Sequence, residues 1–196
     1  GTCIFIEKAI KHGAQVIFFS SDTVFGHNDK LFSDNAKCNP LGFYAEMKCE
    51  VENTFVHSQS FKAIRLSYVF SREDKFSRYL ISCLKTGQVA ELFHPFLRAV
   101  IHREDVVLGV LKLAENWDLI PEQVINFGGP TIISRIEFAT CFKENISNDL
   151  KFTVTEPKAS FFTSRPRKIA MTSPVLETLL GRPALSLSDA VSIEFA

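Results

Sequence analysis

The sequence lacks the features that would place the protein in a membrane or on a nucleic acid. Its 22 basic and 22 acidic side chains leave no net charge, and no long run of lysine and arginine is present. No stretch approaches the roughly 18–20 apolar residues of a membrane-spanning helix. The segment GTCIFIEKAIKHG has neither the basic region nor the cleavage-like site of a signal peptide. We therefore expect a cytoplasmic protein with no nucleic-acid or membrane partner.

Signatures of metal sites and disulfide frameworks are also missing. The five cysteines are far apart and form no C-x-x-C motif, and the five histidines show no ligand spacing. A chain of 196 residues can bury a core without disulfides, so we expect free thiols in a reducing compartment and no metal. What the chain has in abundance is phenylalanine, with 19 residues, which indicates an aromatic core or a partner surface.

The apolar pattern predicts helices that alternate with short strands. Apolar residues at helical spacing predict helices over 3–12, 43–58, 74–87, 103–117 and 134–146. Unbroken apolar runs predict buried strands over 14–20, 61–70 and 124–129. Ser134 and Glu137 have the spacing of a capping box at the start of the last helix. This alternation predicts an α/β fold with a Rossmann-type parallel sheet. The alternation is lost after about residue 150, so we expect that region to form a small, irregular α+β part.

Two groups of polar residues are expected to meet at one edge of this sheet. Ser20, Ser21 and Asp22 follow directly after the strand VIFF, and ligands of open α/β sheets bind beyond the carboxyl ends of the strands. Tyr44 and Lys48 lie four residues apart on the next helix and therefore share one helix face. A hydroxyl, a phenol and an ammonium in one crevice would form an acid–base device. The alternative is that the serines end a strand and that the other two are ordinary surface residues.

Five segments in order resemble one known superfamily. They are VIFFSSDTVFG, NPLGFYAEMKCEVE, IRLSYVF, RAVIHREDVVLGVLKL and SRPRKIAMTSPVLETLLGRP. Together they resemble the extended short-chain dehydrogenase/reductase superfamily over the whole chain. The dTDP-dehydrorhamnose reductase type looks nearest, and sugar-nucleotide epimerases and dehydratases are close by.

The resemblance implies a reaction and a set of catalytic residues. It implies hydride transfer between NAD or NADP and a carbon of a nucleotide-linked sugar. Tyr44 would give or take the hydroxyl proton, Lys48 would favour the phenolate and bind the cofactor ribose, and Ser21 would polarise the carbonyl. We also predict that Ser20, together with Tyr44 and Lys48, contacts the cofactor.

The resemblance also implies substrate contacts. In the epimerase branch an arginine at the position of Arg98 contacts the substrate diphosphate, and Arg165 is the second candidate for that role. A guanidinium suits phosphate because its planar fork matches the phosphate oxygens. Asp22 is the third predicted substrate contact. The alternative is that both arginines form ordinary salt bridges at domain edges.

One expected element is absent from these 196 residues. The glycine-rich G-x-x-G-x-x-G loop of the superfamily, which binds the cofactor pyrophosphate, is not present. Because about half of the nucleotide-binding domain should precede Gly1, we expect this chain to be a fragment of such a protein. The alternative function is a non-catalytic regulatory or scaffold member of the same fold. Thr23 is a smaller departure, since rhamnose-type reductases usually have an aromatic residue there.

The predicted organisation has two parts. Residues 1–70 and 98–127 are interpreted as the remainder of the dinucleotide-binding Rossmann domain. Residues 71–97 and 128–196 are interpreted as the substrate-binding region. The superfamily often pairs through the helix that carries Tyr44, so we also expect a homodimer.

Overall fold

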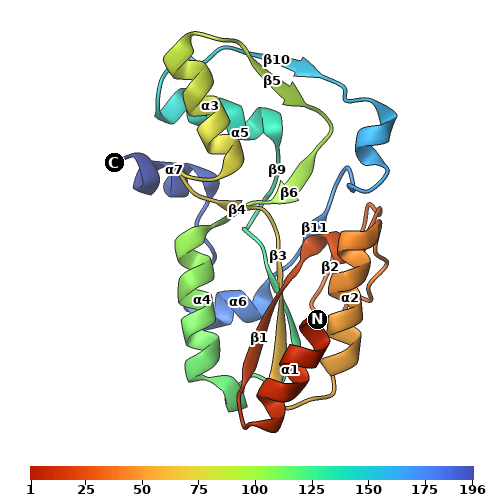
Figure 1. The fold of residues 1–196 in the computed structure, drawn as a ribbon. Coiled ribbons are helices and arrows are strands. Elements are labelled where there is room, and N and C mark those ends of the chain that lie inside the picture. Colours follow the sequence, from red (N-terminus) through yellow and green to blue (C-terminus); the bar gives the residue numbers. More distant parts are fainter.

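Three parallel strands form the centre of one end of the molecule in a computed structural model that describes residues 1–196 (Figure 1). They are β1 (Val16–Ser21), β3 (Phe61–Leu66) and β8 (Val124–Phe127). β3 lies in the middle and pairs with β1 on one side and β8 on the other. Parallel strands that are covered on both faces are apolar along their whole length, which explains the unbroken apolar runs in β1 and β8.

Helices cover both faces of this sheet. They are α1 (Thr2–Lys11) and α2 (Phe43–Phe55) on one face, and α4 (Arg103–Glu115) and α6 (Pro174–Leu180) on the other. Successive residues of a strand point to opposite faces, so Ala63 of β3 packs in the core with α1 and α2. Its neighbour Ile64 packs in the core with α4 and α6. The predicted α/β class and its parallel sheet are therefore confirmed.

The other end of the molecule is a smaller α+β part. It contains α3 (Lys75–Thr86), β5 (Ala90–Phe93), α5 (Arg135–Asn145), β10 (Phe152–Thr155), the 3-10 helix η3 (Ala159–Phe162) and α7 (Leu187–Phe195). β5 and β10 pair in parallel, and α3, α5 and α7 share a large apolar core. Phe138 is central to this core because its ring contacts those of Tyr68, Phe70, Phe76 and Phe142.

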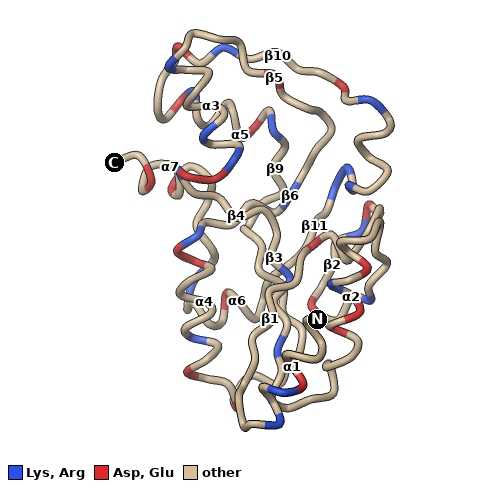
Figure 2. Tube along the Cα trace, in the orientation of Figure 1, with Lys and Arg blue, Asp and Glu red and all other residues tan.

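Short strand pairs lie between the two ends. The pairs are β2 (Leu31–Phe32) with β11 (Ala170–Met171), β4 (Val69–Phe70) with β7 (Ile101–His102), and β6 (Leu97–Ala99) with β9 (Ile132–Ser134). Two further 3-10 turns are η1 (Asp22–Phe25) and η2 (Trp117–Leu119). Charged residues of both signs are spread along the whole chain (Figure 2). No helix is both long and apolar enough to cross a membrane.

The structure agrees with the predicted helices and refines the rest. All five predicted helices are present, and the Ser134–Glu137 capping box is confirmed in both of its hydrogen bonds. The predicted strand over 61–70 is divided into β3 and β4, because β4 leaves the main sheet and pairs with β7. Helix α6 belongs in sequence to the predicted substrate-binding region, yet its Leu176 is fully buried against the main sheet.

The turn after β8 requires glycine for a steric reason. A Cβ atom at Gly129 would lie 1.7 Å from the carbonyl oxygen of Val100, which is far inside any allowed contact. The glycine amide also donates a hydrogen bond to the Ala99 carbonyl. Gly128–Gly129 is thus the point where β8 passes close to the segment that links β6 and β7, and it is a structural turn.

In addition to its apolar contacts, helix α7 is held by one carboxylate. Glu194 accepts hydrogen bonds from the Arg72 amide (3.0 Å) and from His102 Nε2 (2.9 Å), and it forms an ion pair with Arg103 (2.6 Å). Burial alone would raise the pKa of Glu194, but the Arg72 and His102 hydrogen bonds and the Arg103 charge outweigh it. The pKa of this carboxyl therefore lies below its usual range.

A pH titration of stability tests this attachment. A carboxyl whose pKa is lowered by folding stabilises the protein above its unfolded pKa, which is about 4.3 for glutamate, and loses that contribution as the pH falls through the folded value. We expect Glu194→Gln to lower the free energy of unfolding at pH 7 by about 1–2 kcal/mol. The difference from wild type should shrink below about pH 4. Urea denaturation at several pH values measures it.

The matched control is Glu144→Gln, whose exposed carboxylate makes no hydrogen bond or ion pair. It should leave the stability at pH 7 unchanged. A Glu194→Gln difference that stays constant down to pH 3 would show that the Glu194 carboxylate does not fix α7.

Candidate active site

The carboxyl end of β1 turns directly into η1, and Ser21 caps that turn. Its hydroxyl oxygen accepts hydrogen bonds from the Thr23 amide (3.2 Å) and the Thr23 hydroxyl (2.9 Å). Its own proton points to Asp22 over a long 3.4 Å contact. Ser21 is half-buried, so its hydroxyl lies at the edge of the sheet where the sequence predicted it.

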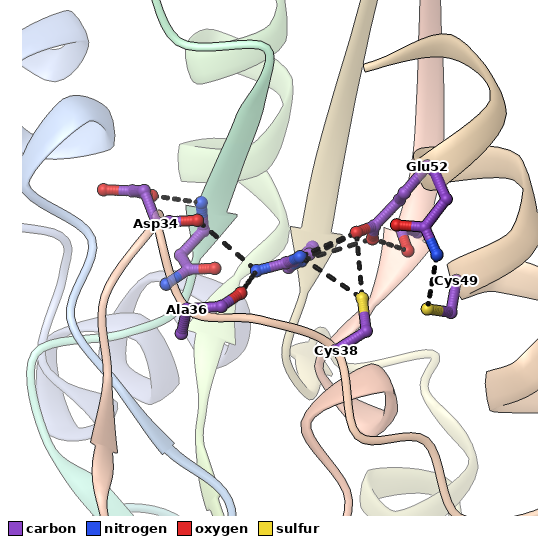
Figure 3. A network of polar contacts seen from close by, with 9 residues as sticks. Asp34, Ala36, Cys38, Cys49 and Glu52 are labelled. Atoms are coloured by element: carbon purple, nitrogen blue, oxygen red, sulfur yellow. Dashed lines mark hydrogen bonds and ion pairs between the residues drawn. The ribbon is translucent and has the colours of Figure 1, made fainter.

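Ser20 belongs to a buried polar network (Figure 3). Its hydroxyl donates to Glu52 of α2 over 2.5 Å, and Arg65 of β3 donates to the same carboxylate over 2.7 Å. Arg65 also donates to the carbonyl of Ala36. Both members of the ion pair are almost fully buried. A cofactor contact by the Ser20 side chain stays a prediction, because its hydroxyl is already used by Glu52.

Cys38 completes this network. Its thiol donates to Glu52 over 3.4 Å, and Arg65 donates to the sulfur over 3.4 Å (Figure 3). Burial, and then the Glu52 charge, raise the pKa of Cys38 well above its usual range. The thiol is thus held protonated and serves as a hydrogen-bond donor. All five cysteines are free.

The structure brings Tyr44 and Lys48 together at the same sheet edge. Helix α2 begins after Gly42, whose φ of +86° lies in the left-handed region that favours glycine. The Lys48 ammonium donates to the Phe19 carbonyl of β1 over 2.6 Å and lies 5.6 Å from the centre of the Tyr44 ring. Burial lowers the pKa of Lys48.

Tyr44 lines a cavity of about 430 Å³. Thr23 of η1, Ser164 and Arg165 line it from other parts of the chain. The Tyr44 side chain is 56% exposed, so its hydroxyl is open to a ligand. This cavity therefore joins the first turn of α2 to the segment after η3. Sequence reasoning noticed Thr23 only as a departure from the family pattern and missed its place beside Tyr44.

Asp22 and Arg98 form a buried pair rather than an open surface. Arg98 Nε lies 3.7 Å from Asp22, and Ser67 donates to the same carboxylate oxygen over 2.8 Å. The Arg98 guanidinium also donates to the carbonyls of Leu97 and Pro166. Burial raises the pKa of Asp22 and lowers that of Arg98, and in each case the partner's charge opposes the shift. Substrate contact by either side chain stays a prediction.

Arg165 lies where two cavities meet. It lines the Tyr44 cavity and also a larger cleft of about 560 Å³ with aromatic walls. Its guanidinium packs over the Phe161 ring at 5.0 Å and forms no ion pair. Arg135, which also lines the larger cleft, was missed in the sequence because its position after the capping serine suggested only the start of a helix.

The parallel sheet and the helices that cover its two faces define a Rossmann-type α/β protein. The family model described as RmlD substrate binding domain matches residues 1–191, and the chain belongs to that family. No curated protein matches the sequence at a significant level.

Solved structures with the same fold are longer than this chain. A dTDP-4-dehydrorhamnose reductase from Clostridium acetobutylicum aligns with a TM-score of 0.82 and 20% identity, covering 95% of this chain and 66% of that one. A hypothetical dTDP-4-dehydrorhamnose reductase from Sulfolobus tokodaii aligns with a TM-score of 0.79 and 20% identity, and the alignment covers 96% of this chain and 67% of that one. A UDP-glucuronic acid 4-epimerase from Bacillus cereus was solved with UDP-glucuronic acid and NAD. It aligns with a TM-score of 0.70 and 19% identity, and the alignment covers 91% of this chain and 59% of that one.

The buried network makes a prediction about stability. Removing one member of a buried ion pair leaves an uncompensated charge, so we expect Glu52→Gln or Arg65→Met to cost about 3–5 kcal/mol. The double variant should cost less than the sum of the two single changes, because neither charge is then left alone. Chemical denaturation of the four proteins measures the coupling.

The exposed pair Glu7–Lys11 is the matched control. Glu7→Gln and Lys11→Met should each change stability by no more than about 0.5 kcal/mol. Additive losses at Glu52 and Arg65 would contradict the role of the pair.

Proposed function

We propose that the protein is an NAD(P)-dependent reductase or epimerase that acts on a nucleotide-linked sugar. The observation that carries the proposal is the contact of the Lys48 ammonium with the Phe19 carbonyl, close to the Tyr44 ring. This contact supports the proposal, because it holds Lys48 near the carboxyl end of β1, the side of the sheet on which α/β proteins bind ligands. Membership of the RmlD substrate binding domain family supports the same class of reaction.

The proposed chemistry uses three side chains. Tyr44 exchanges a proton with the oxygen of the reacting sugar carbon, and the positive charge of Lys48 stabilises the phenolate. Ser21 donates a hydrogen bond to the same oxygen. Its proton is available because the contact with Asp22 is long, while the two bonds from Thr23 hold the serine oxygen in place.

The residues present fit NAD or NADP at the ribose end. An ammonium has three N–H donors, and Lys48 uses one of them on Phe19, which leaves donors for ribose hydroxyls. When bound, the nicotinamide supplies or accepts the hydride. The Bacillus cereus epimerase of similar fold was solved with NAD, which supports this choice.

The nucleotide-linked sugar would extend away from Tyr44 through Arg165. The Tyr44 cavity has room for the sugar, and Arg165 lies between it and the aromatic cleft. UDP-glucuronic acid in the solved epimerase is a ligand of this kind. Asp22 and Arg98 remain part of the proposal as substrate contacts, although both are buried in their own pair.

The proposal includes a homodimer. Ile4 and Phe5 of α1 and Phe43 and Met47 of α2 are exposed large apolar side chains on adjacent helices. Burying them against a second copy would remove apolar surface from water. Sedimentation equilibrium of the wild type and of Phe43→Ser tests this part.

Substitution of the acid–base pair tests the function. In the complete protein, we expect Tyr44→Phe to lower turnover by about 10²–10⁴-fold, measured on dTDP-4-dehydrorhamnose with NADH or NADPH as hydride donor, or on UDP-glucuronic acid with NAD as hydride acceptor. Binding of the sugar nucleotide should be nearly unchanged, because the ring remains. Lys48→Met should reduce both turnover and cofactor affinity, since it removes the charge and the ribose donors. Steady-state kinetics and cofactor fluorescence measure these changes.

Lys112→Met is the control, because Lys112 is a surface lysine of α4 that pairs only with Glu115. It should leave kinetics and cofactor binding unchanged. A Tyr44→Phe variant with full turnover would end the proposed acid–base role. Cofactor and sugar-nucleotide binding without any turnover would favour the non-catalytic alternative.

A further inference from the structure

One cleft at the α+β end has aromatic walls. It measures about 560 Å³ and lies between α3, β5 and η3. The walls are the rings of Tyr68, Phe76, Tyr79, Phe93, Phe96 and Phe161. Phe161 makes edge-to-face contacts with Phe93 (5.1 Å) and Phe96 (6.0 Å), and the Tyr79 hydroxyl accepts a hydrogen bond from the Glu91 amide (2.7 Å). Such rings give a planar ligand surfaces on which to stack.

The charge in this cleft is unbalanced. Lys75, Arg135 and Arg165 line it, and Glu91 is the only acidic side chain among the lining residues. None of the three cations forms an ion pair, whereas Arg65, Arg98, Arg103, Arg167 and Arg182 all do. A cleft with aromatic walls and unpaired cations suits a ligand that combines an aromatic ring with an anion.

Arg135 is the cation set most deeply in the cleft. Its guanidinium packs 3.8 Å from the centre of the Phe76 ring and 4.9 Å from that of Tyr68. Its Nη1 atom is fully buried and has no hydrogen-bond partner. Burial lowers the pKa of Arg135, opposed by the nearby Tyr68 and Asp74. A buried donor without a partner costs free energy, and an anion in the cleft would remove that cost.

Arg98 is close by but is already satisfied. Both guanidinium groups pack near the Phe96 ring, that of Arg98 at 4.2 Å from its centre and that of Arg135 at 5.4 Å. Arg98 is paired with Asp22 and donates to two backbone carbonyls, so a phosphate would compete with Asp22 for its charge. The Nη1 atom of Arg135 has no hydrogen bond to lose, so an incoming anion gains more from Arg135.

We propose that Arg135 binds a phosphate group of a nucleoside diphosphate whose base stacks in the aromatic cleft. Arg165, at the mouth of the cleft, binds the end of the diphosphate that continues towards Tyr44. This inference rests on the proposed function for the identity of the ligand, and it assigns the phosphate contact that the resemblance gave to Arg98 to a different residue.

Calorimetric titration of the 196-residue chain with UDP, uridine and inorganic pyrophosphate tests the proposal. We expect Arg135→Met to weaken UDP binding by about 10- to 100-fold, the value of one or two charged hydrogen bonds. Uridine affinity should change little, because the aromatic walls remain. Arg135→Lys keeps the charge but loses the planar fork, so it should recover only part of the UDP affinity.

The matched control is Arg72→Met. Arg72 also packs over an aromatic ring, that of Phe195 at 5.2 Å, but it lies outside the cleft. It should not alter UDP binding. Thermal unfolding of each variant separates a loss of ligand contact from a loss of fold, and Arg135→Lys provides the test if Arg135→Met does not fold.

The results distinguish this inference from the proposed function. UDP affinity that depends on Arg165 but not on Arg135 overturns the inference and leaves the sugar-nucleotide function in place. Pyrophosphate binding that depends on Arg135, without any UDP binding, overturns the inference, because the proposed ligand is a nucleoside diphosphate. If neither probe binds in the millimolar range, the inference is overturned, while the proposed hydride chemistry is judged separately by turnover.

Discussion

The buried ion pair between Arg65 and Glu52 is the interaction on which the rest of the structure depends. Arg65 lies on the central strand β3, and Glu52 lies on α2, so the pair fixes that helix to the sheet. The same carboxylate accepts from Ser20 at the end of β1. Through the carbonyl of Ala36, Arg65 also holds the loop between β2 and α2. A pair with this many additional hydrogen bonds compensates its desolvation better than an isolated pair would.

That network has a direct consequence for the position of Lys48, a member of the proposed acid–base pair. Lys48 lies one helical turn before Glu52 on α2. Because Glu52 is fixed against β3, the position of Lys48 along β1 is fixed as well. The ammonium then reaches the Phe19 carbonyl, one residue before Ser20. Ser20 and Glu52 thus serve as positioning residues for the neighbours that would meet the substrate. Catalytic groups need such support, because small displacements are costly to reaction rates.

The sequence predicted the helices and main strands well because each has a strong local signal. Apolar spacing revealed α1 to α5, and the Ser134–Glu137 capping box marked the start of α5. Strands β6 and β9 have three residues each, too few for a periodic pattern, and their pairing depends on contacts between distant segments. The candidate site also contains parts that local sequence predicts and parts that it does not. The adjacency of Tyr44 and Lys48 follows from helical spacing alone. The burial of Arg98 could not be predicted, because its partners come from Asp22 and from the carbonyl of Pro166, far away in the chain.

The family resemblance and the geometry of the structure point to different arginines as the phosphate-binding residue. A matched motif identifies a residue type at a position, but whether a guanidinium is open to a ligand depends on how many of its donors the fold already uses. Arg98 matches the family segment, is paired with Asp22 and donates to two backbone carbonyls, whereas Arg135 matches no motif and has a buried donor without a partner. Because two cations near Phe96 repel each other, the one without a counter-ion gains most from an incoming anion. The charge that attracts a phosphate into the cleft is therefore expected from Arg135, while Arg98 helps to hold the end of β1 against β6.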